Sequence, residues 1–185
     1  RKSLPTEERA VSTPTTMRGV VMYGPGDVRV EDRPLPHVIE PTDAVLRVEA
    51  ACICGSDLWP YRGIDAEFPP GGRPMGHEYV GTVVEVGAQV HGVAVGDLVV
   101  GSFCISDNTC EICASGFQSR CVNGGFMGDT QAQYTRVPLA DGTLVPVPGG
   151  MPDDEDVLAS LLAASDVLGT GWFGAVAAEA GPGRT

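Results

Sequence analysis

Hydrophobic and polar residues alternate in short runs through most of the chain. The runs are rich in β-branched residues and cover 18–22, 28–30, 44–50, 79–86 and 98–100. They predict β-strands, because successive side chains of a strand point to opposite faces of a sheet. Glycine and proline separate these runs at 24–26, 69–72 and 148–150, which predicts turns and loops. We therefore expect a mainly β fold, a closed or partly open barrel of short strands.

The pattern changes at residue 151. Acidic residues at 153–156 precede the apolar stretch 157–164 and predict the start of a helix, since carboxylates stabilise that end of the helix dipole. A second helix is predicted at 168–180, with a stop at the Gly-Pro-Gly sequence 181–183. At the other end, residues 1–16 are polar and lack an apolar period, which predicts a disordered leader. Folded structure is expected from Met17.

Composition and charge exclude several classes of protein. The chain has 185 residues, 43% of them hydrophobic, which is ordinary for a globular protein. Its net charge of -12, with 12 Lys and Arg, argues against a nucleic-acid partner, because a polyanion requires a clustered basic surface. No apolar run approaches the ~20 residues needed to cross a bilayer, and no secretory signal opens the chain. A cytoplasmic location without membrane contact is expected.

Two short motifs carry the chemistry. Cys54 is followed by Ser56 and Asp57, and further along come Gly76, His77, Glu78, Gly81, Gly87 and Val90. This spacing resembles the signature of the zinc-dependent medium-chain alcohol dehydrogenases. Thiolate and imidazole are strong zinc ligands, and a catalytic zinc keeps one position open beside three protein ligands.

The resemblance implies a GroES-like barrel and a catalytic zinc. The barrel is expected at 17–160, and residues 161–185 are expected to form linker helices at the start of a coenzyme-binding Rossmann domain. Cys54 and His77 fill two ligand positions, and Asp166 is the candidate for the third. Its alternative role is that of a helix N-cap. The family pattern also places Glu78 behind the zinc, Asp57 against the other ring nitrogen of the histidine, and Ser56 in the proton path.

A second cysteine cluster resembles the structural zinc lobe of the same family. The family pattern is C-x2-C-x2-C-x7-C, and here Cys110, Cys113 and Cys121 match its last three positions. Asp107 stands at the first position, and an Asp oxygen is an acceptable zinc ligand. Cys104, three residues earlier, is the alternative. Four protein ligands would make this a closed structural site, so two zinc ions are expected.

The coenzyme loop is not found in this stretch of sequence. A glycine-rich segment at 169–174 fits the pattern G-x-G-x-x-G, but that fingerprint requires a preceding strand, and a helix is predicted there instead. In the family, the true fingerprint follows a segment like residues 180–185. We therefore expect a fragment that does not bind NAD or NADP productively, whereas the full-length enzyme does.

The expected activity is an NAD(P)-linked interconversion of a small alcohol with an aldehyde or ketone, in an enzyme that forms a homo-oligomer at full length. Trp59 and Tyr61 are candidates for a substrate wall or for barrel-edge packing. Cys52 is predicted to be a buried small hydrophobic residue, and His37 and His91 are given no role. One rival is a non-catalytic, zinc-stabilised binding module. Another is a zinc-free reductase, which would lack the Cys54 and His77 pair.

Overall fold

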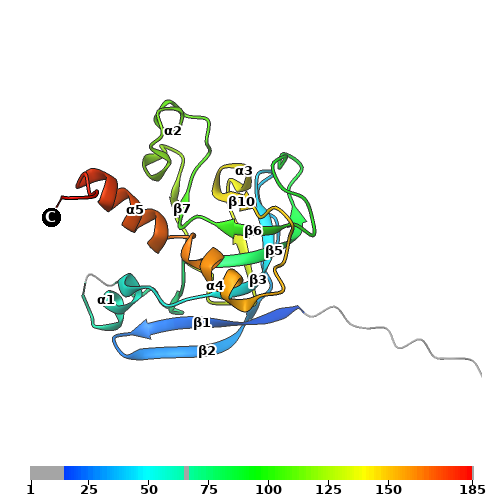
Figure 1. The fold of residues 1–185 in the computed structure, drawn as a ribbon. Helices are drawn as coiled ribbons and strands as arrows, with labels where there is room; N and C mark the ends of the chain where they lie inside the picture. Colours follow the sequence, from blue (N-terminus) through cyan, green and yellow to red (C-terminus); the bar gives the residue numbers. More distant parts are fainter. Residues whose placement is uncertain (1–14, 65–66, 185) are drawn as a thin grey trace, which may run out of the picture.

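The computed structural model describes residues 15–64 and 67–184 (Figure 1). The strands are β1 Thr16–Gly24, β2 Asp27–Pro34, β3 Ala44–Ala51, β4 Arg73–Pro74, β5 Tyr79–Val86, β6 Leu98–Gly101, β7 Cys104–Ile105, β8 Gly125–Phe126, β9 Tyr134–Val137 and β10 Leu144–Pro146. The helices are α1 Leu58–Tyr61, α2 Glu111–Ala114, α3 Ala140–Thr143, α4 Glu155–Ala163 and α5 Val167–Ala177, with 3-10 turns η1 Gly55–Asp57 and η2 Gln118–Arg120. All five predicted strand runs are strands.

The first strand begins slightly earlier than expected. Most of the predicted leader at residues 1–16 lies outside the described residues. Thr16, however, already pairs with Pro34 in the hairpin of β1 and β2. The shortest elements, including β4 and β7 to β10, escaped prediction, because two to four residues carry too little periodicity to be recognised.

Three antiparallel sheets form the fold. The largest has the strand order β10-β6-β5-β3-β9, a second has the order β2-β1-β4, and β7 with β8 forms a ribbon. Gln133 joins the two larger sheets, because its N–H donates to the Arg18 carbonyl in β1 and its carbonyl accepts from the Val48 N–H in β3. The result is the expected partly open barrel.

Strand β5 is apolar along most of its length because both of its faces are covered. Tyr79 and Val83 point into the main core, which also contains Leu46 and Val99. Val80 points the other way, into a smaller cluster. This alternation follows from the two-residue repeat of a strand.

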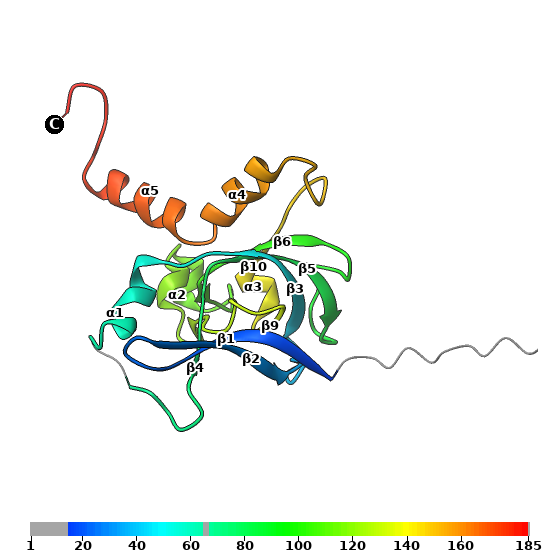
Figure 2. The same cartoon turned by 90° about the horizontal axis from the view of Figure 1, so that it is seen from below.

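Helix α4 covers that outer face. Leu158, Leu161 and Leu162 pack against Val80 and against the outward side chains of β6. Figure 2 shows α4 and α5 on one side of the barrel, with β1 and β2 on the opposite side. The boundary predicted between residues 160 and 161 thus falls inside α4.

Helix α5 ends three residues before the predicted stop. The Glu179 N–H donates to the Val176 carbonyl and the Ala180 N–H to the Ala175 carbonyl, which is the pairing of a Schellman motif. Glu179 adopts the left-handed conformation, with φ of 51°, at the position where glycine is usual. The glycines at 181 and 183 therefore misplaced the end of the helix.

The apolar side chains of α5 have no cover among the described residues. Trp172 and Phe173 are each 71% exposed, and none of the residues of this helix is buried. In the described part of the chain, no single helix is long and apolar enough to cross a membrane. The bent pair of α4 and α5 reaches the required length and composition only jointly, across a 53° bend.

Candidate metal centres and active site

Cys54, His77 and Asp166 lie far apart in the sequence and meet where β3 ends and β5 begins. Cys54 caps the turn η1 just after β3, and His77 lies two residues before β5. The pairing of Ala51 with Tyr79 brings these two segments together. Asp166 enters from the junction of α4 and α5, and its Oδ2 lies 3.5 Å from His77 Nε2 and 3.8 Å from Cys54 Sγ.

Asp166 holds the N-cap position of α5, but its carboxylate does not cap the backbone. Its Oδ1 accepts a hydrogen bond from the hydroxyl of Thr170, and its Oδ2 faces His77 and Cys54. Both roles considered for this residue thus meet at one position: the backbone is at the helix start and the side chain points into the cluster. The side-chain direction favours the ligand role.

The donor atoms fit a tetrahedral zinc ion. Zinc bonds of about 2.0–2.3 Å in tetrahedral arrangement place neighbouring ligand atoms about 3.3–3.8 Å apart. The two distances from Asp166 fall in this range. Glu78 adds a second indication: it is 1% exposed, and its Oε1 is buried without a hydrogen-bond donor, 4.0 Å from His77 Nε2. A buried carboxylate oxygen without a donor requires a nearby cation or proton.

Asp57 holds two of the three candidate ligands in place. Its Oδ1 lies 3.5 Å from His77 Nδ1, so that Nε2 is the ring nitrogen facing the cluster. Its Oδ2 accepts from the backbone N–H of Cys54 at 2.9 Å and from the amide of Gln131 at 3.3 Å. This is the place predicted for Asp57. Gln131 carries no sequence signal and was missed.

The prediction for Cys52 was wrong. The residue is half-buried, and its thiol donates to Glu78 Oε2 at 2.6 Å. Burial and the Glu78 carboxylate raise the pKa of Cys52 to about 12. Burial also raises the pKa of the Cys54 thiol, so a metal ion must displace a proton when it binds there.

A cavity of about 240 Å³ opens beside His77. Ser56 lines it, with its Oγ 3.4 Å from His77 Nε2. Trp59, Pro60, Ile64, Met75 and Met127 supply most of the apolar wall. Trp59 thus lies where a substrate wall was expected, whereas Tyr61 lines a neighbouring cavity.

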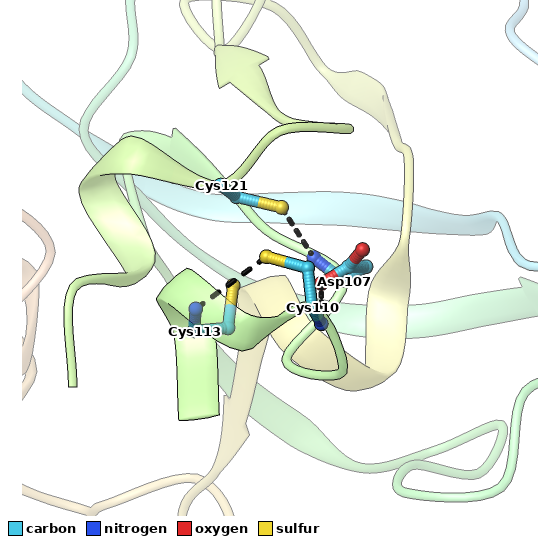
Figure 3. A group of neighbouring side chains, drawn as sticks. All are labelled: Asp107, Cys110, Cys113 and Cys121. Carbon is cyan, nitrogen blue, oxygen red and sulfur yellow. Dashed lines mark hydrogen bonds between the residues drawn. The ribbon is translucent and has the colours of Figure 1, made fainter. Parts of the chain in front are cut away.

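The second cluster gathers Asp107, Cys110, Cys113 and Cys121, and Figure 3 shows these side chains converging around α2. Their ligand atoms all lie within 4.8 Å of one another. Cys104 is buried in β7 and does not belong to the group. Four protein donors leave no open coordination position, as in a structural zinc site.

Hydrogen bonds in this cluster stabilise the charged forms of Asp107 and Cys110, which favours binding of a cation. Backbone N–H groups of Thr109 and Cys110, with the amide of Asn123, hold the pKa of Asp107 well below its usual range. The N–H of Cys113 lowers the pKa of Cys110, whereas burial raises that of Cys113 to about 12. The carboxylate is therefore ionised, and zinc binding displaces thiol protons.

The remaining sequence candidates lie elsewhere. The glycine-rich segment 169–174 is wholly within α5 and follows another helix, so the strand that a dinucleotide fingerprint requires does not precede it. His91 is exposed, with its backbone N–H bonded to Asp141, and His37 lines a separate cavity. Neither belongs to a metal cluster in the part of the chain that the structure describes.

Comparisons with known proteins agree with this geometry. The family model of the alcohol dehydrogenase GroES-like domain matches residues 40–149. The chain is 43% identical to the medium chain reductase/dehydrogenase ucsI of Acremonium sp, over 92% of this chain and 58% of that protein. It is 41% identical to zinc-type alcohol dehydrogenase B of Aspergillus flavus, over 93% of this chain and 40% of that protein.

Solved structures agree as well. Alcohol dehydrogenase TADH from Thermus sp. ATN1 matches with a TM-score of 0.79 and 33% identity, over 90% of this chain and 49% of that chain. A structure described as a zinc-binding dehydrogenase from Sinorhizobium meliloti 1021, bound to NADP, matches with a TM-score of 0.59 and 29% identity, over 74% of this chain and 40% of that chain.

These matches define the class of the protein as a GroES-like, mainly β domain. More particularly, the chain belongs to the zinc-dependent medium-chain alcohol dehydrogenase family, of which it represents the N-terminal part. The predicted resemblance and fold class are confirmed. The chain spans about half the length of the relatives it matches.

Proposed function

We propose that this protein is part of a zinc-dependent oxidoreductase that interconverts a small alcohol with an aldehyde or ketone. The observation that carries the proposal is the cluster of Cys54, His77, Glu78 and Asp166, whose ligand atoms all lie within 4.8 Å of one another, beside an open cavity lined by Ser56. Asp166 lies at the spacing of zinc ligands from both His77 and Cys54, whereas Glu78 Oε1 lies farther away, 4.0 Å from His77 Nε2. Three ligands would therefore leave one position open toward the cavity, as in a catalytic zinc site.

Cys54, His77 and Asp166 would hold the zinc ion, which would supply a Lewis acid to lower the pKa of a substrate hydroxyl. Ser56 is exposed in the cavity and its Oγ lies 3.4 Å from His77 Nε2, so it can relay the hydroxyl proton, accepting it while passing its own proton to solvent water. Asp57 keeps the histidine ring oriented through Nδ1. The apolar side of the cavity, with Trp59, would contact the carbon chain of the substrate, and Ser56 and His77 line its polar side.

The alcohol carbon would lose a hydride on oxidation, and NAD or NADP in the full-length enzyme would accept it. Support for a nicotinamide comes from the NADP-bound relative of known structure. The proposal includes a homo-oligomeric, cytoplasmic enzyme, as in the family. All six cysteines are free thiols, which suits a reducing compartment.

Metal content and alcohol-dependent reduction of NAD(P), both measured on the full-length enzyme, test the proposal together. We expect two zinc ions per chain and activity with alcohols. The substitution His77→Ala removes one ligand of the open site, so it should lose one zinc ion and the activity. His91→Ala is the matched control, because His91 is exposed and outside both clusters. Equal zinc content and activity in the parent and His77→Ala proteins would contradict the proposal.

A further inference from the structure

The carboxylate of Glu78 has two oxygens in different surroundings. Oε2 accepts a hydrogen bond from the Cys52 thiol at 2.6 Å. Oε1 is buried, has no donor and lies 4.0 Å from His77 Nε2, on the side of the metal cluster. The two ends of one buried carboxylate are thus assigned to two different partners, a thiol and the metal site.

The position of the thiol is set by the backbone on both sides of it. Cys52 follows β3 directly, and the pairing of Ala51 with Tyr79 places it opposite Glu78, which precedes β5. The carbonyl of Cys52 accepts from the amide of Gln131 at 3.0 Å, and the same amide donates to Asp57. The thiol is therefore anchored in the hydrogen-bond network that positions His77.

We propose that Cys52 is a positioning residue that holds Glu78 Oε2 away from the catalytic metal, so that only Oε1 can approach it. This inference rests on the proposed zinc site at Cys54, His77 and Asp166. A carboxylate can bind a metal through one oxygen or both. An oxygen that already accepts a hydrogen bond from a neighbouring thiol is held in that bond, and the open coordination position stays free for substrate.

Cobalt substitution tests the inference through the visible absorption spectrum, independently of enzyme activity. Co²⁺ in place of zinc reports coordination number through its visible absorption, which is intense for four ligands and weak for five or six. The part of the spectrum that disappears in His77→Ala belongs to the open site. We expect Cys52→Ala to weaken that part, because a freed Oε2 can join Oε1 on the metal. We also expect the zinc dissociation constant of this site to change by about 10- to 100-fold.

Rescue separates hydrogen bonding from packing. Cys52→Ser keeps a donor of similar size and should restore the spectrum and the zinc affinity of the parent. In Glu78→Gln, the further change Cys52→Ala should alter little, since the carboxylate that the thiol holds is already gone. Thr82→Val is the matched control, because it removes a half-buried hydroxyl that donates to a different carboxylate, Glu49, at 2.6 Å, and it should leave the His77-dependent spectrum unchanged.

Two results would overturn the inference, and they differ. If Cys52→Ala keeps the spectrum and zinc affinity of the parent, or if Cys52→Ser behaves like Cys52→Ala, the role of the thiol is wrong while the metal site stands. If His77→Ala leaves cobalt binding and spectrum unchanged, the open metal site itself is wrong, and the inference fails with it. Circular dichroism of each variant confirms that the fold is retained.

Discussion

Two carboxylates at the candidate active site each contact two partners. Asp57 is bonded to the backbone of Cys54 and to the ring of His77, and Glu78 lies between the Cys52 thiol and the metal cluster. Outer contacts of this kind fix the orientation of a metal ligand and tune its basicity. Ser56 differs because it lines the open cavity, where its hydroxyl lies beside both His77 and the Cys54 thiol.

Ser56 is therefore the residue whose loss should affect catalysis most selectively. We expect Ser56→Ala to lower kcat by about 10²- to 10⁴-fold, the usual contribution of a positioned proton acceptor. Its zinc content should equal that of the parent, because the hydroxyl is not one of the candidate ligands. Steady-state kinetics and metal analysis of the full-length enzyme check both.

The matched control is Ser160→Ala, an exposed serine of α4 whose hydroxyl only binds the Asp156 carbonyl. It should keep the parent kcat. A Ser56→Ala enzyme as fast as Ser160→Ala would show that the proton leaves by another path.

At the scale of elements, β5 links the core to the site. Tyr79 begins this strand immediately after His77 and Glu78, is completely buried, and lies opposite Gly101 of β6. A Cβ at residue 101 would overlap the Tyr79 ring. The pairing of Gly101 with Tyr79 thus fixes the register between β5 and β6. That register sets the position of His77 and Glu78, which directly precede β5.

Gly101→Ala should consequently destabilise the fold. Forcing a methyl group into this packed position costs about 1–3 kcal/mol of the free energy of unfolding. Urea denaturation measures the change. Gly24→Ala is the control, since Gly24 lies in β1 with open space around its Cβ direction and an ordinary φ. If both variants unfold at the same urea concentration, the packing argument fails.

The molecule as a whole carries two candidate metal sites among its described residues, each a group of four possible ligands. The group with His77 borders a cavity, whereas the group around α2 is the proposed closed structural site. Under the proposal, the first would meet a substrate, and the second would contribute to stability by holding a loop of the chain around a metal.

Cys113→Ser in the lobe should remove one zinc ion and lower the midpoint of thermal unfolding. Each kcal/mol lost corresponds to about 2–4 °C for a chain of this size. The His77-dependent cobalt spectrum should persist, because the open site is intact. Metal analysis and calorimetry check these expectations.

Cys104→Ala decides between the two ligands that the cysteine spacing left open. It should keep both zinc ions, since Cys104 lies outside the cluster. Loss of a zinc ion from Cys104→Ala and not from Asp107→Ala would assign the fourth position to the cysteine instead.

The sequence by itself determined the strands with a two-residue repeat, the helices after residue 151 and the residue types of both metal sites. These features depend on local periodicity and on short spacing, which can be counted along the chain. The proposed ligand roles of Cys54 and His77 rest on one motif each and on the family resemblance.

Only the tertiary structure decided which distant side chains meet. Asp166 points toward His77 because α4 packs on β5 and β6 and brings the start of α5 to that end of the barrel. Cys52 reaches Glu78 because of the register between β3 and β5. Strand register and helix packing arise from contacts between segments far apart in sequence, and a shift of one residue would turn these side chains to the opposite face.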